Sequence, residues 1–270
     1  MGLSLDGVCY RYSRRTDRVV DNLSLTFRPG TTALLGRNGA GKSTILSLLA
    51  TRLSPQQGFI SHDGMQVTRR TLTRYRRQVA RLPQQVAPIP GFTVRESVVY
   101  AGWLGCLPWK QADDNADAAL ARVSLSRQAN DPAKSLSGGQ LRRLGIAQSL
   151  ARNGTWLLLD EPFAGLDPTE RIHLQHVLKG ISRTVHMVIS THQTADIITL
   201  FDTIVVIDAG RMLWRGGPAQ FFAMAPDEFS GTDRAMRTID TGKQQDGYRT
   251  HLAGADDRYT HFTQWPPGPG

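Results

Sequence analysis

Short apolar runs alternate with amphipathic segments along much of the chain. The runs are of strand length, and the segments between them carry apolar residues at helical spacing. In chain order they are Thr31–Leu35 and then Ser43–Ala50, Trp156–Leu159 and then Thr169–Ile181, Val185–Ile189 and then Thr194–Phe201, and finally Ile204–Ile207. Strands that alternate with helices in this way predict an α/β domain with a parallel central sheet.

Two regions depart from this alternation. Near the N-terminus, Leu23, Leu25 and Phe27 alternate with polar residues, as they do in a half-exposed antiparallel strand. We therefore expect a small antiparallel β layer beside the parallel core. The stretch from Thr93 to Val123 has helical spacing and no strand-like run, which predicts a helical insertion at about residues 92–135.

The last 45 residues differ in composition from the rest. Residues 226–270 contain two aliphatic residues of the Ile, Leu and Val type and end in WPPGPG, so they can bury little surface. We expect one folded domain over residues 1–225 and a flexible or loosely docked tail over 226–270. The tail has seven acidic and five basic residues, so the positive charge of the chain belongs to the folded domain.

Composition is typical of a globular enzyme. The chain has 270 residues, of which 40% are hydrophobic, enough to fill a core. Its formal net charge of +9 favours an anionic neighbour, such as a nucleotide, a nucleic acid or an acidic membrane face. Charge alone does not choose among these three.

The cysteines and the N-terminus bear on location. Cys9 and Cys106 have no metal-ligand spacing and are too few for a disulfide framework, and we expect each to be a small buried residue. The start of the chain shows no signal peptide, and no window approaches the roughly 20 apolar residues of a membrane-spanning helix. These features predict a cytoplasmic protein that reaches a membrane only through a partner.

One stretch matches the phosphate-binding pattern GxxxxGK[ST]. It follows the predicted strand Thr31–Leu35, precedes a predicted helix, and consists of Gly36, Arg37, Asn38, Gly39, Ala40, Gly41, Lys42 and Ser43, with Thr44 next. The glycines let successive N–H groups point inward, and the helix directs its positive end at the same place, so the loop can bind polyphosphate. Lys42 can contact the β and γ oxygens, and the Ser43 hydroxyl suits Mg²⁺. Arg37 is either a further phosphate donor or a solvated side chain.

Two adjacent acids end the apolar strand at Trp156–Leu159. We expect Asp160 to hold the Mg²⁺ shell, as the acidic partner of a phosphate-binding loop does. Neighbouring residues at a strand end point to opposite sides, so Glu161 is placed to face a water molecule and act as general base. Either motif alone is compatible with a merely polar strand end, but the two together favour hydrolysis of a nucleotide.

A third motif narrows the choice among families of phosphate-loop proteins. Leu136-Ser137-Gly138-Gly139-Gln140, placed before Asp160, resembles the signature of the ATP-binding cassette (ABC) ATPases. Ser137 alone is an ordinary helix cap, but the combination of motifs is similar to that family over roughly residues 3–217. The resemblance implies the ABC ATPase fold, in which a phosphate-loop core carries an antiparallel β layer and a helical insertion.

The resemblance also assigns further residues. Tyr12 resembles the aromatic side chain that stacks on adenine, with Tyr10 as the alternative, and Gln84 resembles the glutamine that reaches the metal, with Gln85 as the alternative. Asp167 resembles the acid that crosses the dimer interface. His192 resembles the histidine that contacts the γ-phosphate, and the strand before it ends at the sheet edge where α/β folds bind ligands.

In this family two cassettes form a head-to-tail dimer. The resemblance therefore implies that ATP and Mg²⁺ bind between the phosphate loop of one subunit and Ser137, Gly138, Gly139 and Gln140 of the other. Both half-sites are intact, which predicts a homodimer. The resemblance further implies ATP hydrolysis that drives a polytopic membrane permease, with the chain on the cytoplasmic face of the cell membrane as a peripheral subunit.

Three alternatives stay open at this point. A cassette ATPase that acts on nucleic acid or ribosomes is disfavoured, because those relatives carry a coiled-coil insertion or a second cassette, so no nucleic-acid partner is expected. A module that binds ATP without turnover is disfavoured by Glu161 and His192. The segments FTVRESVVYAGW and LRRLGIAQSLARNG resemble bacterial exporters of drugs, antibiotics or polysaccharides, which favours export over import of a metal chelate or vitamin.

Two features have both a functional and a plain explanation. The six arginines between residues 69 and 81 are either a solvated face or a region near lipid headgroups or the permease; they are Arg69, Arg70, Arg74, Arg76, Arg77 and Arg81. The insertion carries large apolar side chains that either pack its own core or form a groove for a permease helix; they are Val98, Val99, Trp103, Leu104 and Trp109.

Overall fold

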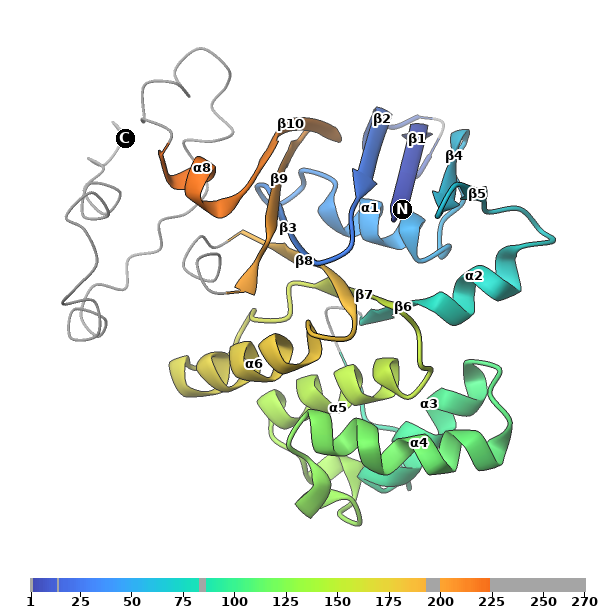
Figure 1. Ribbon diagram of the computed structural model, residues 1–270, viewed down its shortest axis with the longest axis vertical. Helices are drawn as coiled ribbons and strands as arrows, with labels where there is room; N and C mark the ends of the chain where they lie inside the picture. The colour runs from blue at the N-terminus through green and yellow to red at the C-terminus, as the bar shows by residue number, and fades with distance from the viewer. Residues whose placement is uncertain (1, 14, 83–85, 193–199, 224–270) are drawn as a thin grey trace.

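The computed structural model describes residues 2–13, 15–82, 86–192 and 200–223. A six-stranded sheet lies between a smaller antiparallel sheet with helix α1 on one side and a group of helices on the other (Figure 1). This is the α/β architecture expected from the alternation of apolar runs and amphipathic segments, with the antiparallel layer and the helical insertion in the predicted places.

The larger sheet has the strand order β10-β9-β3-β8-β7-β6. Its strands are β3 (Thr31–Leu35), β6 (Val79–Leu82), β7 (Trp156–Asp160), β8 (His186–Thr191), β9 (Thr203–Asp208) and β10 (Arg211–Gly216). Five of them pair in parallel, and β10 adds an antiparallel edge to β9. Every residue of β3 and β7 is buried, which explains their continuous apolar sequences, because strands covered on both faces cannot alternate.

The smaller sheet is antiparallel and has the order β2-β1-β4-β5. Its strands are β1 (Leu3–Tyr10), β2 (Val20–Phe27), β4 (Gln57–His62) and β5 (Met65–Gln66). In β2 the residues Leu23, Leu25 and Phe27 are buried and the residues between them are exposed. The alternation seen in the sequence thus corresponds to a sheet with one face on the core and one on solvent.

Helices cover both faces of the larger sheet. The α-helices are α1 (Lys42–Leu49), α2 (Leu72–Gln78), α3 (Val94–Leu104), α4 (Trp109–Arg122), α5 (Gly138–Leu150), α6 (Pro168–Ile181) and α8 (Pro218–Ala223), with short 3₁₀ turns at Ser126–Gln128 and Ala133–Ser135. The predicted insertion is formed by α3 and α4, which pack on each other and on α5. The helix expected at Thr194–Phe201 falls mainly outside the described residues, as does the tail expected over 226–270.

Two hydrophobic cores meet at the larger sheet. One lies between the sheet and helices α3 to α6, and the other lies between the sheet, α1 and the antiparallel layer. Neighbouring residues of β3 divide between them, since Leu34 belongs to the second core and Leu35 to the first. The sheet is therefore anchored on both faces, which fixes the loops at the ends of its strands.

One expectation about the cysteines is wrong. Cys9 is buried in β1, but Cys106 is exposed in the turn between α3 and α4. Its φ of 68° places it in the left-handed region. The short turn between the two helices leaves the Cys106 side chain at the surface.

Candidate functional site

The phosphate loop joins β3 to α1 at the edge formed by the strand ends. Gly41 precedes α1 with a φ of 100°, a conformation that favours glycine. A side chain at Gly36 would collide with the backbone, because its Cβ would lie 2.3 Å from the carbonyl oxygen of Ile207. Arg37, Asn38 and Gly39 are exposed at the tip of the loop, whereas Ala40 is buried. The loop thus presents backbone N–H groups and the start of a helix to solvent, which suits an anion.

Lys42 connects the loop to the acidic strand end. Its Nζ donates to the carbonyl oxygens of Gly36, at 2.7 Å, and Arg37, at 3.1 Å. The same nitrogen lies 3.5 Å from Glu161 Oε1. Burial lowers the pKa of Lys42, while the carboxylates of Glu161 and Asp160 act in the opposite direction. A buried ammonium held in this way is placed to neutralise an incoming polyphosphate.

Asp160 is buried at the end of β7 and is surrounded by donors. Its Oδ1 accepts from the hydroxyls of Ser43, at 3.0 Å, and Ser190, at 2.8 Å. Its Oδ2 accepts from Arg81 Nη2 at 2.7 Å. The carboxylate and the Ser43 hydroxyl, which the sequence assigned to the metal, are therefore direct neighbours.

Glu161 points to a different set of groups. Its Oε2 lies 2.9 Å from His192 Nδ1 and its backbone N–H donates to Ser190 Oγ. Strand alternation predicts that Asp160 and Glu161 point to opposite sides, and the two carboxylates contact different groups. The geometric reason differs, however, because Glu161 follows the strand with a φ of 46°, so a left-handed turn aims its side chain.

Tyr12 lies beside the start of α1. It is 62% exposed, and its hydroxyl lies 3.0 Å from Thr44 Oγ1. Tyr10 packs edge-on against it with 5.2 Å between ring centroids, and is partly buried against the core. An exposed ring next to the phosphate loop is available for stacking on a flat base, and Tyr10 is less available.

The signature sequence begins helix α5. Ser137 Oγ accepts from the Gln140 N–H while the Gln140 side chain accepts from the Ser137 N–H, a reciprocal capping box. Ser137 and Gly138 are exposed, whereas a Cβ on the buried Gly139 would lie 2.5 Å from Glu170 Oε2. Asp167 caps α6 by accepting from the Glu170 N–H. Within this chain the polar groups of Ser137 and Gln140 bond each other.

The expected residues thus fall into two groups. Lys42, Ser43, Asp160, Glu161 and His192 come together at the strand ends, and Ser137 to Gln140 form a separate exposed helix start. Gln84 and its alternative Gln85 lie outside the described residues.

Two residues at this site are not predicted from the sequence. Ser190 and Arg81 both contact Asp160, directly and at hydrogen-bonding distance. Ser190 stands two residues before His192 at the end of a buried strand, a polar position that signals a partner. Arg81 was assigned to an exposed or membrane-facing arginine cluster, but its side chain is 12% exposed, because β6 is alongside β7. Arg69, Arg70, Arg74, Arg76 and Arg77 are exposed.

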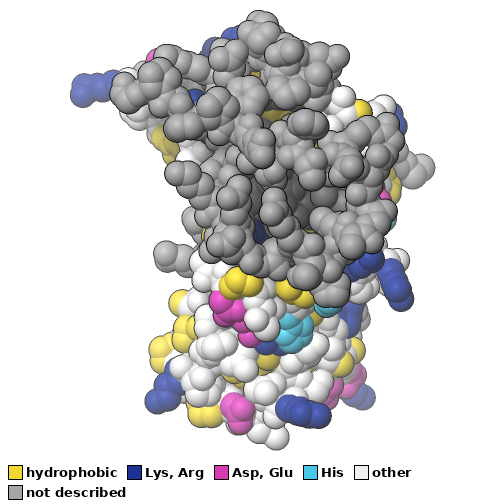
Figure 2. All heavy atoms as spheres, turned by 90° about the vertical axis from the view of Figure 1, so that its left-hand side faces the viewer, with side chains coloured by type: hydrophobic (Ala, Val, Ile, Leu, Met, Phe, Trp, Pro, Cys, Tyr) yellow, Lys and Arg dark blue, Asp and Glu magenta, His cyan; other side chains and the backbone are white. Residues whose placement is uncertain are grey.

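The described residues on the face in Figure 2 show no concentrated basic field. In its described part, basic side chains lie mainly at the edges, and acidic, histidine and hydrophobic side chains lie between them. In the part of the chain that the structure describes, no helix is both long enough and apolar enough to cross a membrane.

Comparison with known proteins identifies the family. The model of the family described as ABC transporter matches residues 20–164, more than half of the chain. The chain is 34% identical to the methionine import ATP-binding protein MetN 2 of Pseudomonas entomophila (strain L48), with 93% of this chain and 77% of the relative covered. It is 30% identical to the linearmycin resistance ATP-binding protein LnrL of Bacillus subtilis (strain 168), with 78% and 68% covered.

A solved structure has the same fold. The protein cbiO1 of Clostridium perfringens, described as part of the ABC transporter complex cbiONQ, superposes with a TM-score of 0.72 at 27% identity, covering 82% of this chain and 90% of that one. Together with the family match, this shows that the chain belongs to the ATP-binding subunits of ABC transporters, a family of ATPases.

Proposed function

We propose that this chain hydrolyses MgATP as one half of a homodimer that drives export through a separately encoded polytopic permease. The observation that carries the proposal is the convergence of Lys42, Asp160, Glu161 and His192 at the phosphate loop. In this arrangement a cation, a metal-type carboxylate, a base and a histidine surround the place where a terminal phosphate would lie.

The residues present fit Mg²⁺. The Ser43 hydroxyl and the Asp160 carboxylate lie 3.0 Å apart and are both oxygen donors, which this cation prefers. We propose that they hold the metal with the phosphates of ATP, and that Gln84 joins them. When bound, the metal neutralises charge on the β and γ phosphates.

Glu161 is proposed as general base. The attacking water gives its proton to the Glu161 carboxylate as its oxygen bonds to the γ-phosphorus, and the bond from that phosphorus to the β-bridging oxygen breaks, releasing ADP and phosphate. His192 Nδ1, at 2.9 Å from Glu161 Oε2, orients the carboxylate, and its ring faces the γ-phosphate. Lys42 balances the charge, and Tyr12 stacks on adenine.

The second subunit completes the site. Ser137, Gly138, Gly139 and Gln140 are proposed to contact the γ-phosphate of the ATP that the other subunit holds, with Asp167 at the interface. Support comes from the exposed start of α5, where an N-terminal helix end has room for an anion. Among the described residues a Cβ on Gly138 would meet nothing within 4 Å, so packing against them does not require glycine there, and we propose that close approach of the other subunit's ATP does.

The permease is proposed to dock on the helical insertion, with the chain lying on the cytoplasmic face of the membrane. The apolar side chains that the sequence singled out separate into two sets: Val98 and Val99 are buried in the core, whereas Trp103, Leu104 and Trp109 are 48%, 58% and 59% exposed. Large exposed apolar side chains of this kind are typical anchors of a protein interface.

Export is proposed as the direction. The exporter-like segments after residue 92 and after the signature support it, and a relative in a resistance system, LnrL, shares 30% identity. The relative MetN 2 is named for import, so import is the second candidate. We further propose that residues 1–225 form the cassette and 226–270 a tail without its own core.

Mixing two inactive variants tests the homodimer. Lys42→Ala disables the phosphate loop, and Gly138→Asp places a negative charge in the signature without an internal clash. Each alone is expected to be inactive, but an equal mixture forms mixed dimers with one intact composite site, restoring roughly a quarter of the wild-type rate. A mixture as inactive as its components contradicts the homodimer.

Transport in inside-out vesicles tests the direction. Vesicles carrying the permease and this chain should accumulate the substrate when ATP is added outside. ATP-driven loss of enclosed substrate that depends on a binding protein in the lumen contradicts export.

A further inference from the structure

Four arginines surround a hollow of about 470 Å³ beside the edge strand β6. They come from four separate segments of the chain: Arg52 follows α1, Arg76 belongs to α2, Arg81 belongs to β6 and Arg152 follows α5. None of the residues that line this arginine hollow is acidic. Like charges repel, so this cluster of arginines costs free energy that a bound anion would offset.

The arginine hollow is held in place by hydrogen bonds to the backbone and to a threonine. Arg76 Nε donates to Thr51 Oγ1 at 2.8 Å, and its Nη2 donates to the Thr51 carbonyl at 3.1 Å. Arg152 Nη2 donates to the Arg76 carbonyl at 3.4 Å. These contacts fix the two guanidinium groups before any ligand arrives, which reduces the entropy lost on binding.

Two of these arginines are packed tightly at the Nε end of their guanidinium groups. The Nε atoms of Arg81 and Arg152 are buried, and neither has a hydrogen-bond partner among the described residues. Burial lowers the pKa of Arg152, and the charge of the neighbouring Arg76 lowers it further. Both atoms are closed to solvent, and a Cβ on Gly105 would lie 2.5 Å from Arg152 Nε. A ligand in the hollow would therefore meet the other guanidinium nitrogens.

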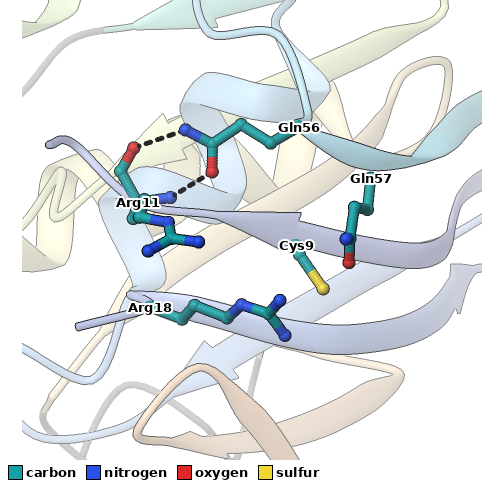
Figure 3. A pocket seen from close by; sticks show the side chains of 5 residues that line it. All are labelled: Cys9, Arg11, Arg18, Gln56 and Gln57. Atoms are coloured by element: carbon teal, nitrogen blue, oxygen red, sulfur yellow. Dashed lines mark hydrogen bonds between the residues drawn. The ribbon is translucent and has the colours of Figure 1, made fainter. Parts of the chain in front are cut away.

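A second arginine-containing hollow provides a contrast. It measures about 560 Å³ and is lined by Cys9, Arg11, Arg18, Gln56 and Gln57 (Figure 3). Arg18 donates to Asp21 at 2.7 Å, and the backbone of Arg11 exchanges hydrogen bonds with the Gln56 amide. Each hollow thus has one arginine paired with a carboxylate, Arg18 with Asp21 here and Arg81 with Asp160 beside β6. The arginine hollow beside β6 differs because three further arginines line it, namely Arg52, Arg76 and Arg152.

We propose that the arginine hollow binds a phosphate group. Guanidinium groups present paired N–H donors that match phosphate oxygens, and several together are typical of phosphate recognition. The ligand lies apart from the phosphate loop, because the hollow is formed by α2, β6 and the ends of α1 and α5. The group is supplied either by a free phosphate compound or by the headgroup of an anionic phospholipid.

Arg81 connects the arginine hollow to the nucleotide site. Its Nη2 donates to Asp160 Oδ2, and its side chain also lines the hollow. A phosphate bound in the hollow would share the guanidinium charge of Arg81 and loosen its hold on Asp160.

Pyrophosphate is the probe for the free ligand, and Lys42→Ala removes binding at the phosphate loop. In that background, thermal unfolding with increasing pyrophosphate should show stabilisation. Arg52→Gln/Arg152→Gln should weaken the pyrophosphate affinity by roughly tenfold or more. The control is Arg127→Gln/Arg183→Gln, which removes the same charge from exposed positions and should leave the affinity unchanged. Arg52→Gln alone, at an exposed residue, should also weaken it while the melting temperature without pyrophosphate stays unchanged.

Flotation with vesicles of phosphatidylglycerol tests the lipid source. Binding that is lost in the arginine-hollow variants but kept in the control supports a headgroup, whereas stabilisation by pyrophosphate without vesicle binding supports a free phosphate compound. Equal losses in both double variants, or neither stabilisation nor vesicle binding in the Lys42→Ala protein, overturn the proposal.

Discussion

Arg81 Nη2 lies 2.7 Å from Asp160 Oδ2, although 79 residues separate the two along the chain. The pair forms because β6 and β7 are parallel neighbours, with Arg81 opposite Leu158 in the register. Both side chains are largely buried, at 12% and 4% exposure. The carboxylate proposed to hold the metal therefore has a built-in cation as its partner.

Arg81→Gln should destabilise the nucleotide-free protein and strengthen metal binding. Removing one partner of a buried ion pair leaves an unmatched charge, so we expect a loss of about 3 kcal/mol in the free energy of unfolding. Without a competing guanidinium, Asp160 should bind Mg²⁺ more tightly when ATP is present. Urea unfolding and Mg²⁺ titration of ATP-induced thermal stabilisation measure the two effects.

The control for this change is Arg18→Gln. Arg18 pairs with Asp21 at the same 2.7 Å but is 40% exposed, and exposed pairs contribute little to stability because solvent screens them. Equal effects of the two substitutions on unfolding, or unchanged Mg²⁺ affinity in Arg81→Gln, would contradict the account.

Ser137→Ala should reduce both helix stability and ATP turnover. The lost cap costs about 1 kcal/mol in unfolding, and the signature loses a donor to the γ-phosphate of the other subunit. Thr93→Ala is a matched control, since Thr93 and Glu96 form the same capping box at the start of α3. We expect a similar loss of stability there with turnover nearly unchanged. If turnover falls equally in both variants, Ser137 acts only as a cap.

Tyr12 should contribute to ATP affinity through its ring rather than its hydroxyl. Tyr12→Ala is expected to weaken ATP binding by about 1–3 kcal/mol, the range for an aromatic ring stacked on a base. Tyr12→Phe removes only the contact with Thr44 and should bind nearly as well as wild type. Titration with a fluorescent ATP analogue measures both, and a larger loss in Tyr12→Phe than in Tyr12→Ala excludes stacking.

The sequence predicts most of the fold and the site because both depend on local patterns. Continuous apolar runs such as Trp156–Leu159 are strands buried on both faces, and the loop ending in Lys42 and Ser43 has its strand and helix context beside it. The acids that follow the apolar run are necessarily at the carboxyl edge, since parallel strands end there together.

What the sequence does not predict depends on contacts between distant segments. Nothing in the sequence distinguishes Arg81 from five nearby arginines that are exposed. The pairing of β6 with β7 buries it. The direction of Glu161 depends on its φ of 46°, which alternation along a strand does not anticipate. In the sequence Val99 and Trp103 are both apolar residues of a predicted helix. The packing of α3 on α4 and α5 buries Val99 and leaves Trp103 exposed.

Steady-state ATP turnover of Glu161→Gln, measured alongside its ATP affinity, tests the central claim that Glu161 is the base of this ATPase. The amide keeps the shape of the side chain and loses the proton acceptor, so turnover should fall by about 10²–10⁴-fold while ATP still binds. Lys42→Ala, in contrast, should lose ATP binding itself, because it removes the cation at the phosphates. Turnover of Glu161→Gln close to that of the wild type would contradict the account.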